Sequence, residues 1–408
     1  MNVEVIAKET PKVACHDCGL VHDIPHSSAE IRCGRCYAKL YDRSYGWLEK
    51  TLALTLTGLL LFLASNTLPF LHVELNGISY QTTLLSGVAT MFSHEHFFLG
   101  VLVLGTTFIF PLLELLCLTF ISVTYALRKV VVGRRFALSL LVALRPWSML
   151  EILLLSLVIA LVKMSDFFTF DPGPALFCFF GLVFSLVGAN RYLNRHRIWQ
   201  WISSSNMYYK KDNVRFSSCQ HCEALIGGDV LSELGHCPRC KSKVHHRKPH
   251  SFQKAFAFTI AAIVLYIPAN TYPILHSTSL GSTSSDTIFS GVVHLFESGL
   301  WLLALIVFIA SILVPVIKIV TMLVLLYSVS KQSQAYVVQK TKIYRIIEVI
   351  GRWSMVDVFV VTLLVALVQF DFVATVDAGV AVIAFGGVVI LSMLGTAAFD
   401  QRLLWDKR

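Results

Sequence analysis

The chain has 408 residues, of which 55% are hydrophobic and only 14% are charged, and its mean hydropathy is +0.68. This composition is too apolar for the surface of a soluble protein, so it excludes the soluble globular class and indicates a protein whose solvent is the bilayer. The formal net charge is +9, from 34 basic and 25 acidic residues. In a membrane protein such an excess lies in cytoplasmic loops, so we expect no nucleic-acid partner.

The first 46 residues are polar and contain two Cys-x-x-Cys pairs with 14 residues between them. The four cysteines are Cys15, Cys18, Cys33 and Cys36. Their spacing predicts two knuckles that place four thiolates tetrahedrally around one metal ion, as in a zinc ribbon. Disulfides and redox or haem sites are the alternatives, but no pair is followed by His and a cytosolic location disfavours disulfides. We predict a structural zinc site, with iron as the second candidate metal.

Four apolar segments follow these cysteines, near the roughly 20 residues that a helix needs to cross a bilayer. They lie at 50–70, 98–126, 147–165 and 174–193. The loop between the second and third segments is basic, with Arg128, Lys129, Arg134, Arg135 and Arg145, so the positive-inside rule places it in the cytoplasm. The stretch from Leu71 to Phe97 has no Lys or Arg and should face outward as short strands and an interfacial helix.

The second half of the chain repeats the first. The metal-type cysteines recur 204 positions later as Cys219, Cys222, Cys237 and Cys240. Asn66-Thr-Leu-Pro69 returns as Asn270-Thr-Tyr-Pro273, and the series from Trp147 to Glu151 returns 206 positions later as Trp353 to Asp357. The corresponding apolar segments lie at 254–273, 299–327, 354–371 and 378–397. Such self-similarity indicates a tandem duplication.

We therefore predict a mostly α polytopic membrane protein with two tandem repeats, each a zinc-ribbon-like module followed by a four-helix transmembrane bundle, about eight transmembrane helices in all. The modules are predicted at 1–46 and 201–250, and the bundles at 47–200 and 251–408. An even number of spans in each bundle puts both modules and both termini in the cytoplasm. No apolar stretch precedes the first cysteines, so no cleavable signal peptide is expected. Repeats of equal orientation should be related by a pseudo-twofold axis along the membrane normal.

Ionisable residues inside the predicted spans are functional candidates, because a charge in the bilayer is costly. Lys318 and Asp357 are placed to form an ion pair, which is either functional or a structural brace. The repeat puts Glu114 at the position of Lys318 and Glu151 at that of Asp357. Two close carboxylates would hold one proton between them, unless they face opposite sides and are satisfied separately.

Two serines, Ser148 and Ser354, stand three residues before the acid of their repeat, on the same helical face. They either extend a polar network or bond back to their own helix. The Asn-Thr-x-Pro turns are predicted to end a span on the outer side, because Pro cannot continue the hydrogen-bond pattern. A binding role for Asn66 or Asn270 is the less favoured interpretation.

These features together resemble the paraquat-inducible protein A family over nearly the whole chain. The resemblance rests on the paired cysteine modules, the duplicated four-span unit, Pro315 with Lys318, the segment from Gly351 to Asp357 and the segment from Asp400 to Asp406. It implies an inner-membrane protein of Gram-negative bacteria that works with a periplasm-spanning MCE-domain protein, PqiB-like or LetB-like, to move lipids between membranes. It also implies that the Lys318 and Asp357 positions belong to a polar network beside a lipid pocket. Glu114 and Glu151 depart from the family pattern.

The main functional hypothesis is a non-enzymatic subunit that transfers phospholipids between the inner membrane and its MCE partner. No G-x-x-x-x-G-K-[ST] motif is present, so energy would come from a proton gradient, a separate protein or the lipid gradient. The Glu114 and Glu151 pair suggests a rival, a proton-coupled exporter of small amphipathic or cationic toxicants. A second rival is a metal-dependent membrane scaffold. We expect the second bundle to carry the working site and the first to support or energise it.

Overall fold

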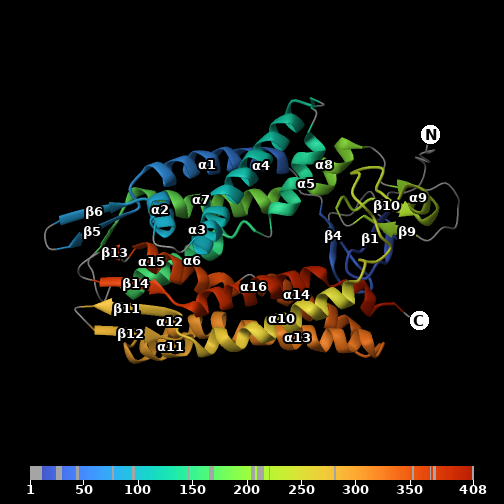
Figure 1. The fold of residues 1–408 in the computed structure, drawn as a ribbon. Coiled ribbons are helices and arrows are strands. Elements are labelled where there is room, and N and C mark those ends of the chain that lie inside the picture. Colours follow the sequence, from blue (N-terminus) through green and yellow to red (C-terminus); the bar gives the residue numbers. More distant parts are fainter. Residues whose placement is uncertain are drawn as a thin grey trace.

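The computed structural model describes residues 12–23, 30–42, 46–75, 78–93, 97–129, 131, 133–145, 147–164, 170–203, 207–208, 216–219, 221–279, 282–351, 353–367, 369–370 and 374–406. The two halves of the chain lie side by side as helical bundles (Figure 1). One end of the molecule carries both cysteine modules, and the opposite end carries two small sheets. These are called the module end and the sheet end below. The mostly α class with two tandem repeats is confirmed.

The first bundle begins with α1 (Trp47–Thr67), which packs along α7 (Pro174–Tyr192). Small residues let these two helices approach closely: a Cβ atom added at Gly188 would lie 3.0 Å from Leu54, and one at Gly181 would lie 3.0 Å from Leu61. Close packing at small residues is a principal source of helix association in a bilayer, where water exclusion contributes little. In the second bundle α10 (Ser251–Thr271) packs along α16 (Val380–Ala398) in the same way.

The second span of each bundle is a long rod with a π-helical turn in its middle. The first rod joins α3 (Phe97–Val103), η1 (Leu104–Ile109) and α4 (Phe110–Ala126), and the second joins α12 (Trp301–Phe308), η2 (Ile309–Leu313) and α13 (Val314–Ser330). Each π turn comes just before a proline, Pro111 or Pro315. Proline lacks the N–H that an α-helix would use there, and the wider turn accommodates that loss.

The helix at the third predicted span of each bundle is shorter than predicted. The helices α6 (Leu150–Met164) and α15 (Val356–Leu367) have 15 and 12 residues. At about 1.5 Å per residue they extend about 22 and 18 Å, less than the roughly 30 Å of the hydrocarbon core. Six helices in the described part of the chain are long and apolar enough to span. In the centre of the molecule α6 and α15 pack together, and the Ser156 hydroxyl donates to the Val356 carbonyl at 2.9 Å.

The predicted short strands and the helix after them are present at the sheet end. One sheet joins β5 (Leu71–Leu75), β6 (Ile78–Thr82) and β7 (Phe170–Pro172), next to α2 (Leu84–Ser93). The other joins β11 (Leu275–Ser279), β12 (Ser282–Asp286), β13 (Gln369–Phe370) and β14 (Ala374–Ala378), next to α11 (Ile288–Glu297). Asn66 and Asn270 each donate to a carbonyl of their own helix at 2.8 Å, which supports the helix-ending role.

At the module end the first cysteine module contains β1 (Lys12–Ala14), β2 (Val21–Asp23), β3 (Glu30–Arg32) and β4 (Lys39–Asp42). The second contains β8 (Met207–Tyr208), β9 (Phe216–Ser218), β10 (Leu225–Gly227) and α9 (Gly228–Leu234). Helices α5 (Arg134–Leu144), α8 (Arg195–Ile202), α14 (Val337–Ile350) and the short turns η3 (Trp353–Met355) and η4 (Gln401–Leu404) lie at the module-proximal side of the bundles. In space, each bundle ends beside a module (Figure 1).

Candidate functional site

Both sets of four cysteines form compact clusters in which every side chain offers one sulfur, and all four sulfurs lie within 4.8 Å of one another. The sulfur of Cys15 lies 3.4 Å from that of Cys36, and Cys222 lies 3.5 Å from Cys237. Four thiolates bound at about 2.3 Å to one tetrahedral ion lie about 3.8 Å apart, whereas disulfide sulfurs lie about 2.05 Å apart. The predicted metal-binding arrangement is therefore confirmed for both sets.

The backbone shows how these loops bring the four sulfurs together. In each knuckle the N–H of the residue after the second cysteine donates to the carbonyl of the first, as from Gly19 to Cys15 at 2.8 Å. That residue has positive φ in all four knuckles, at Gly19, Tyr37, Glu223 and Lys241. The sulfurs consequently point inward from two facing turns, and the four protein ligands leave no open coordination position. His22 contacts Cys33 at 3.2 Å through Nε2 and lies outside the quartet.

The first module docks on the end of the second half of the chain through its described residues. Asp17 is buried between the two cysteines of the first knuckle and pairs with Arg345 of α14 at 2.5 Å. Gln401 of η4 also donates to Asp17, at 2.5 Å. The Arg35 guanidinium lies 4.2 Å from the ring centroid of Trp405. The metal-binding knuckles themselves are thus the surface that docks on the second bundle.

The second module makes the reciprocal contact with the end of the first bundle. Arg239 lies between Cys237 and Cys240, as Arg35 lies between Cys33 and Cys36. It is only 1% exposed and donates to the carbonyls of Trp199 and Ser203, both at 3.2 Å. Trp199 and Trp405 are equivalent in the repeat, so the arrangement is symmetric. The sequence pattern indicated the two modules but not that their contacts are crossed.

Replacing Asp17 by Asn tests the crossed contact. The variant keeps the shape of the side chain and removes the charge that pairs with Arg345, so the first module should dock less tightly. We expect its cysteines to react roughly tenfold faster with a maleimide, because a hydrogen bond to a charged group contributes about 1.5–3 kcal/mol. Arg135→Gln, an exposed basic residue of α5, is the control. Unchanged thiol reactivity in Asp17→Asn would contradict the crossed contact.

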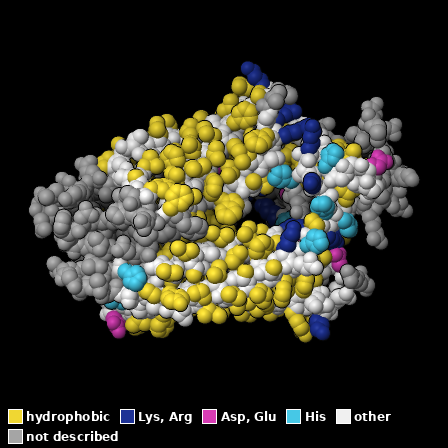
Figure 2. Space-filling view, viewed as in Figure 1, with side chains coloured by type: hydrophobic (Ala, Val, Ile, Leu, Met, Phe, Trp, Pro, Cys, Tyr) yellow, Lys and Arg dark blue, Asp and Glu magenta, His cyan; other side chains and the backbone are white. Residues whose placement is uncertain are grey.

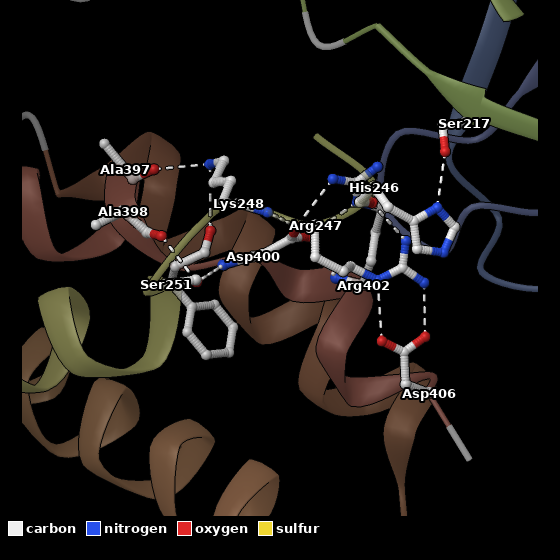
Figure 3. A network of polar contacts seen from close by, with 11 residues as sticks. Ser217, His246, Arg247, Lys248, Ser251, Ala397, Ala398, Asp400, Arg402 and Asp406 are labelled. Carbon is white, nitrogen blue, oxygen red and sulfur yellow. Dashed lines mark hydrogen bonds and ion pairs between the residues drawn. The ribbon is translucent and has the colours of Figure 1, made fainter. Parts of the chain in front are cut away.

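A polar network fastens the segment between the second module and α10 to the end of α16 (Figure 3). Arg247 makes two hydrogen bonds to Asp406, at 2.9 and 2.6 Å. Lys248 donates through its backbone N–H to Asp400 at 3.0 Å and through its ammonium to the Ala397 carbonyl at 2.7 Å. Arg402 makes two further bonds to Asp400, both at 2.9 Å. This network fixes the second module relative to the bundle of its own half.

Asp400 supplies a pH-dependent part of this anchoring. Burial alone would raise the pKa of Asp400, but the charge and hydrogen bonds of Arg402 and the backbone N–H bonds hold it below its ordinary value of 3.8. Because the folded pKa is lowered, its stabilisation is present above pH about 4 and is lost as the pH falls through the folded pKa. Asp400→Asn should therefore lower stability by about 3 kcal/mol at neutral pH, since it leaves Arg402 buried and unpaired. Thermal unfolding at neutral and acidic pH should show the difference from the parent shrinking in acid.

A cavity of about 660 Å³ lies between the two halves, near the module end. Figure 2 shows the hollow between the bundles, with basic and His side chains near its rim. It is lined from the first half by Glu114, Ser148, Glu151 and Asn190, and from the second by Lys318. Arg145, Arg191 and Glu348 also line it. Four of the six predicted network residues therefore face one cavity, which is built by both halves.

The remaining predicted network residues are placed less directly. Ser354 is buried at 2% exposure, and its hydroxyl has no hydrogen-bond partner in the described part of the chain. Asp357 belongs to α15, but its side chain lies outside the described residues, so the Lys318–Asp357 pair and its role stay a prediction. Lys318 is 2% exposed and packs on Gly351, where an added Cβ would lie 2.8 Å from its ammonium nitrogen.

Glu114 is 1% exposed on α4 and has a partner that the sequence pattern did not indicate. Asn190 of α7 donates to its Oε1 atom at 2.8 Å. The repeat contains a signal from which Asn190 could have been predicted. Asn190 corresponds to Thr396 in the second half, and both residues line the cavity. Glu151 is exposed and lines the cavity. Cys117 and Cys178 lie on α4 and α7, outside the two metal-type clusters.

The fold and these sites define a polytopic α-helical membrane protein of two repeats, each with a four-cysteine module. The profile of the paraquat-inducible protein A family matches residues 48–203 and 252–408, and the chain belongs to that family. It is 32% identical over 411 residues to lipophilic envelope-spanning tunnel protein A of Escherichia coli K12, an alignment that covers 100% of this chain and 94% of the relative. Intermembrane transport protein PqiA of the same organism is 28% identical over 97% of this chain and 96% of its own length. No solved structure matches the chain.

Proposed function

We propose that this protein transfers phospholipids between the inner membrane and an MCE-domain partner in the periplasm, without covalent chemistry. The names of its relatives, intermembrane transport protein and envelope-spanning tunnel protein, support a transport role between membranes. The observation that carries the proposal is the cavity at the repeat interface, where polar side chains of both halves meet between apolar helices. Repeat interfaces are where transporters commonly bind their substrates and coupling ions.

The working site in this proposal is shared by the two bundles, which revises the expectation that the second bundle alone carries it. Lys318 would attract the phosphate of a headgroup, because an ammonium in a low-dielectric cavity binds anionic oxygens strongly. Glu114, Glu151 and Ser148 face the same space from the first half. Ser354 and Asp357 complete the proposed network beside Lys318. Neighbouring apolar residues, such as Leu186 and Met393, supply a surface suited to acyl chains.

The proposed orientation puts the module end, both termini and both cysteine quartets in the cytoplasm. The basic residues at 128–145 and their counterparts in the second half, Lys331, Lys340, Lys342 and Arg345, lie toward the module end, which supports this orientation through the positive-inside rule. The sheet end would then face the periplasm of a Gram-negative cell and offer the docking face for the MCE partner. Zinc is the proposed metal in both quartets, where it would join two knuckles into one rigid module. Metal analysis of the purified protein should find two zinc ions per chain.

Photocrosslinking tests the lipid proposal directly. A photoreactive phenylalanine at Val187, which lines the cavity, should capture phospholipid. Lys318→Met should reduce this capture roughly tenfold, because one charge-assisted contact to the headgroup is lost. Lys340→Met is the matched control, since Lys340 bonds Ser328 on the module side and does not line the cavity. No lipid at Val187, or equal capture in Lys318→Met, would reject the proposal.

The same preparations separate the two rivals. Flux of a cationic dye into proteoliposomes that needs Glu114 but no MCE partner would indicate the exporter. The scaffold would be indicated if the Cys219→Ser, Cys222→Ser double variant lost all function and Lys318→Met functioned like the parent protein. Under the lipid proposal, dye flux is absent and Lys318→Met is impaired.

A further inference from the structure

Three oxygen atoms around Glu114 are buried and lack hydrogen-bond partners within the described ranges. They are Oε2 of Glu114, Oγ of Ser148 and Oδ1 of Asn190. They come from three separate places in the fold: α4, the segment before α6, and α7. All three residues line the cavity between the halves. The cluster is therefore built by tertiary packing and not by one loop.

The hydrogen bonds that are present fix the orientation of this cluster. The Asn190 amide nitrogen donates to Glu114 Oε1 at 2.8 Å and to the Leu186 carbonyl at 3.1 Å. Both of its N–H groups are thereby used, and the amide oxygen is left as a free acceptor. The Ser148 hydroxyl lies near the Glu114 carboxyl without forming a hydrogen bond to it. A carboxylate, a hydroxyl and an amide oxygen thus line the same cavity.

The charges around the cluster do not provide a paired cation. No ion pair within 4.0 Å joins Glu114 to a basic side chain among the residues that the structure describes. The charged groups on the surrounding elements are Arg145, Glu151, Arg191, Arg195, Lys318 and Glu348. An unpaired carboxylate that is 99% buried in a membrane span is costly, so it requires a cation or a proton.

The two halves differ in charge at the position of Glu114. In the second half the position of Glu114 is occupied by Lys318, whose ammonium is a cation beside the same cavity. At the equivalent position the first half has the carboxylate of Glu114. It also has the amide oxygen of Asn190, where the second half has Thr396. None of the ion pairs among the described residues involves Glu114, which leaves its carboxylate available to a cation from solution.

We propose that Glu114, Ser148 and Asn190 form a binding site for a small monovalent cation, a proton or a sodium ion, which enters through the cavity. The site deepens the proposed transport function, on which its coupling role rests, because it would supply the energy source. A bound sodium ion would use the three oxygens and water from the cavity as ligands. A bound proton would sit on Glu114, whose carboxyl O–H would donate a hydrogen bond to the oxygen of Ser148 or Asn190.

Binding is measured on the full chain in nanodiscs with two probes. Radioactive sodium reports the ion, and infrared difference spectra in titrations report a protonated buried carboxyl by its C=O band. Saturable sodium binding that falls at least tenfold in Glu114→Gln and in Asn190→Leu, but not in Glu348→Gln, supports a sodium site. No sodium binding, with a titrating C=O band that disappears only in Glu114→Gln, supports a proton site. Glu348 lines the same cavity but is exposed and lies outside the cluster.

The proposal would be overturned if the parent protein showed no sodium binding and no C=O band that depends on Glu114. Glu114 would then be a carboxylate solvated by water. The isosteric Glu114→Gln variant is first checked for lipid capture at Val187. Retained lipid capture with no cation binding in the parent protein would reject the cation site alone. Cation binding without any lipid capture would instead reject the lipid function and leave the site standing.

Discussion

Replacing Gly379 by Ala should strongly destabilise the second bundle, although it adds only one methyl group. Gly379 begins α16, and an added Cβ would collide with the backbone carbonyl of Pro273 and approach the carbonyl carbon of Ile274 at 3.2 Å. These backbone atoms belong to the turn between α10 and β11, so they cannot move away as a flexible side chain would. We expect a loss of about 3 kcal/mol or more in the free energy of unfolding.

The control for this prediction is Gly386→Ala, in the same helix. No atom lies within 4 Å of a Cβ added at Gly386, so that variant should unfold at the parent's temperature or slightly above. Thermal unfolding in one detergent compares the three proteins. Because Gly173 makes the equivalent contact with Pro69, Gly173→Ala should destabilise the first bundle in the same way. If the Gly379→Ala protein is as stable as the parent, the backbone at the sheet end moves at little cost to accommodate the added methyl group, and the prediction is wrong.

Loss of the second cysteine quartet should affect the whole protein, whereas loss of the first should remain local. Cys219, Cys222 and Cys237 belong to the main hydrophobic core, which also includes Trp199 and the helices of both bundles. The first quartet belongs to a small separate hydrophobic core, against which Trp405 packs from the end of the second half. Structural zinc sites contribute about 10 kcal/mol or more to the folding of small modules, so both replacements should unfold their own module.

Cys219→Ser with Cys222→Ser should therefore lower the melting temperature of the bundles and the yield of folded protein. Cys15→Ser with Cys18→Ser should leave the bundles folded and release only the first module. Limited proteolysis and thermal unfolding distinguish these results, and Cys117→Ser, a cysteine outside both quartets, is the control. Equal melting of the bundles in both double variants would contradict the unequal integration of the two modules.

The local patterns in the sequence predicted the modules and the repeat well, because four cysteines at fixed spacing leave few alternatives. They overestimated the lengths of α6 and α15, because hydropathy reports composition and not backbone conformation. In the second bundle the apolar run includes Trp353–Met355, where the backbone forms a tight turn before the helix begins. The shared cavity was not predictable. Helices that are apolar on all sides, such as α4 and α16, do not show by their pattern which face turns inward. The Asp17–Arg345 contact joins surfaces more than 300 residues apart, so no local signal indicates it.

The crossed docking of the cysteine modules has a consequence for how such a chain can be assembled. In one repeat alone, the cysteine knuckles would lack the bundle end that they contact here, and that bundle end would lack the knuckles of the other module. Two separate copies of a repeat would satisfy both needs by exchanging modules around a twofold axis, which is the closed, self-complementary arrangement of a swapped homodimer. The present chain has the geometry of such a dimer whose subunits have been fused. Once the subunits are fused, Glu114 and Lys318 no longer have to be the same residue, and one cavity can have two chemically different sides.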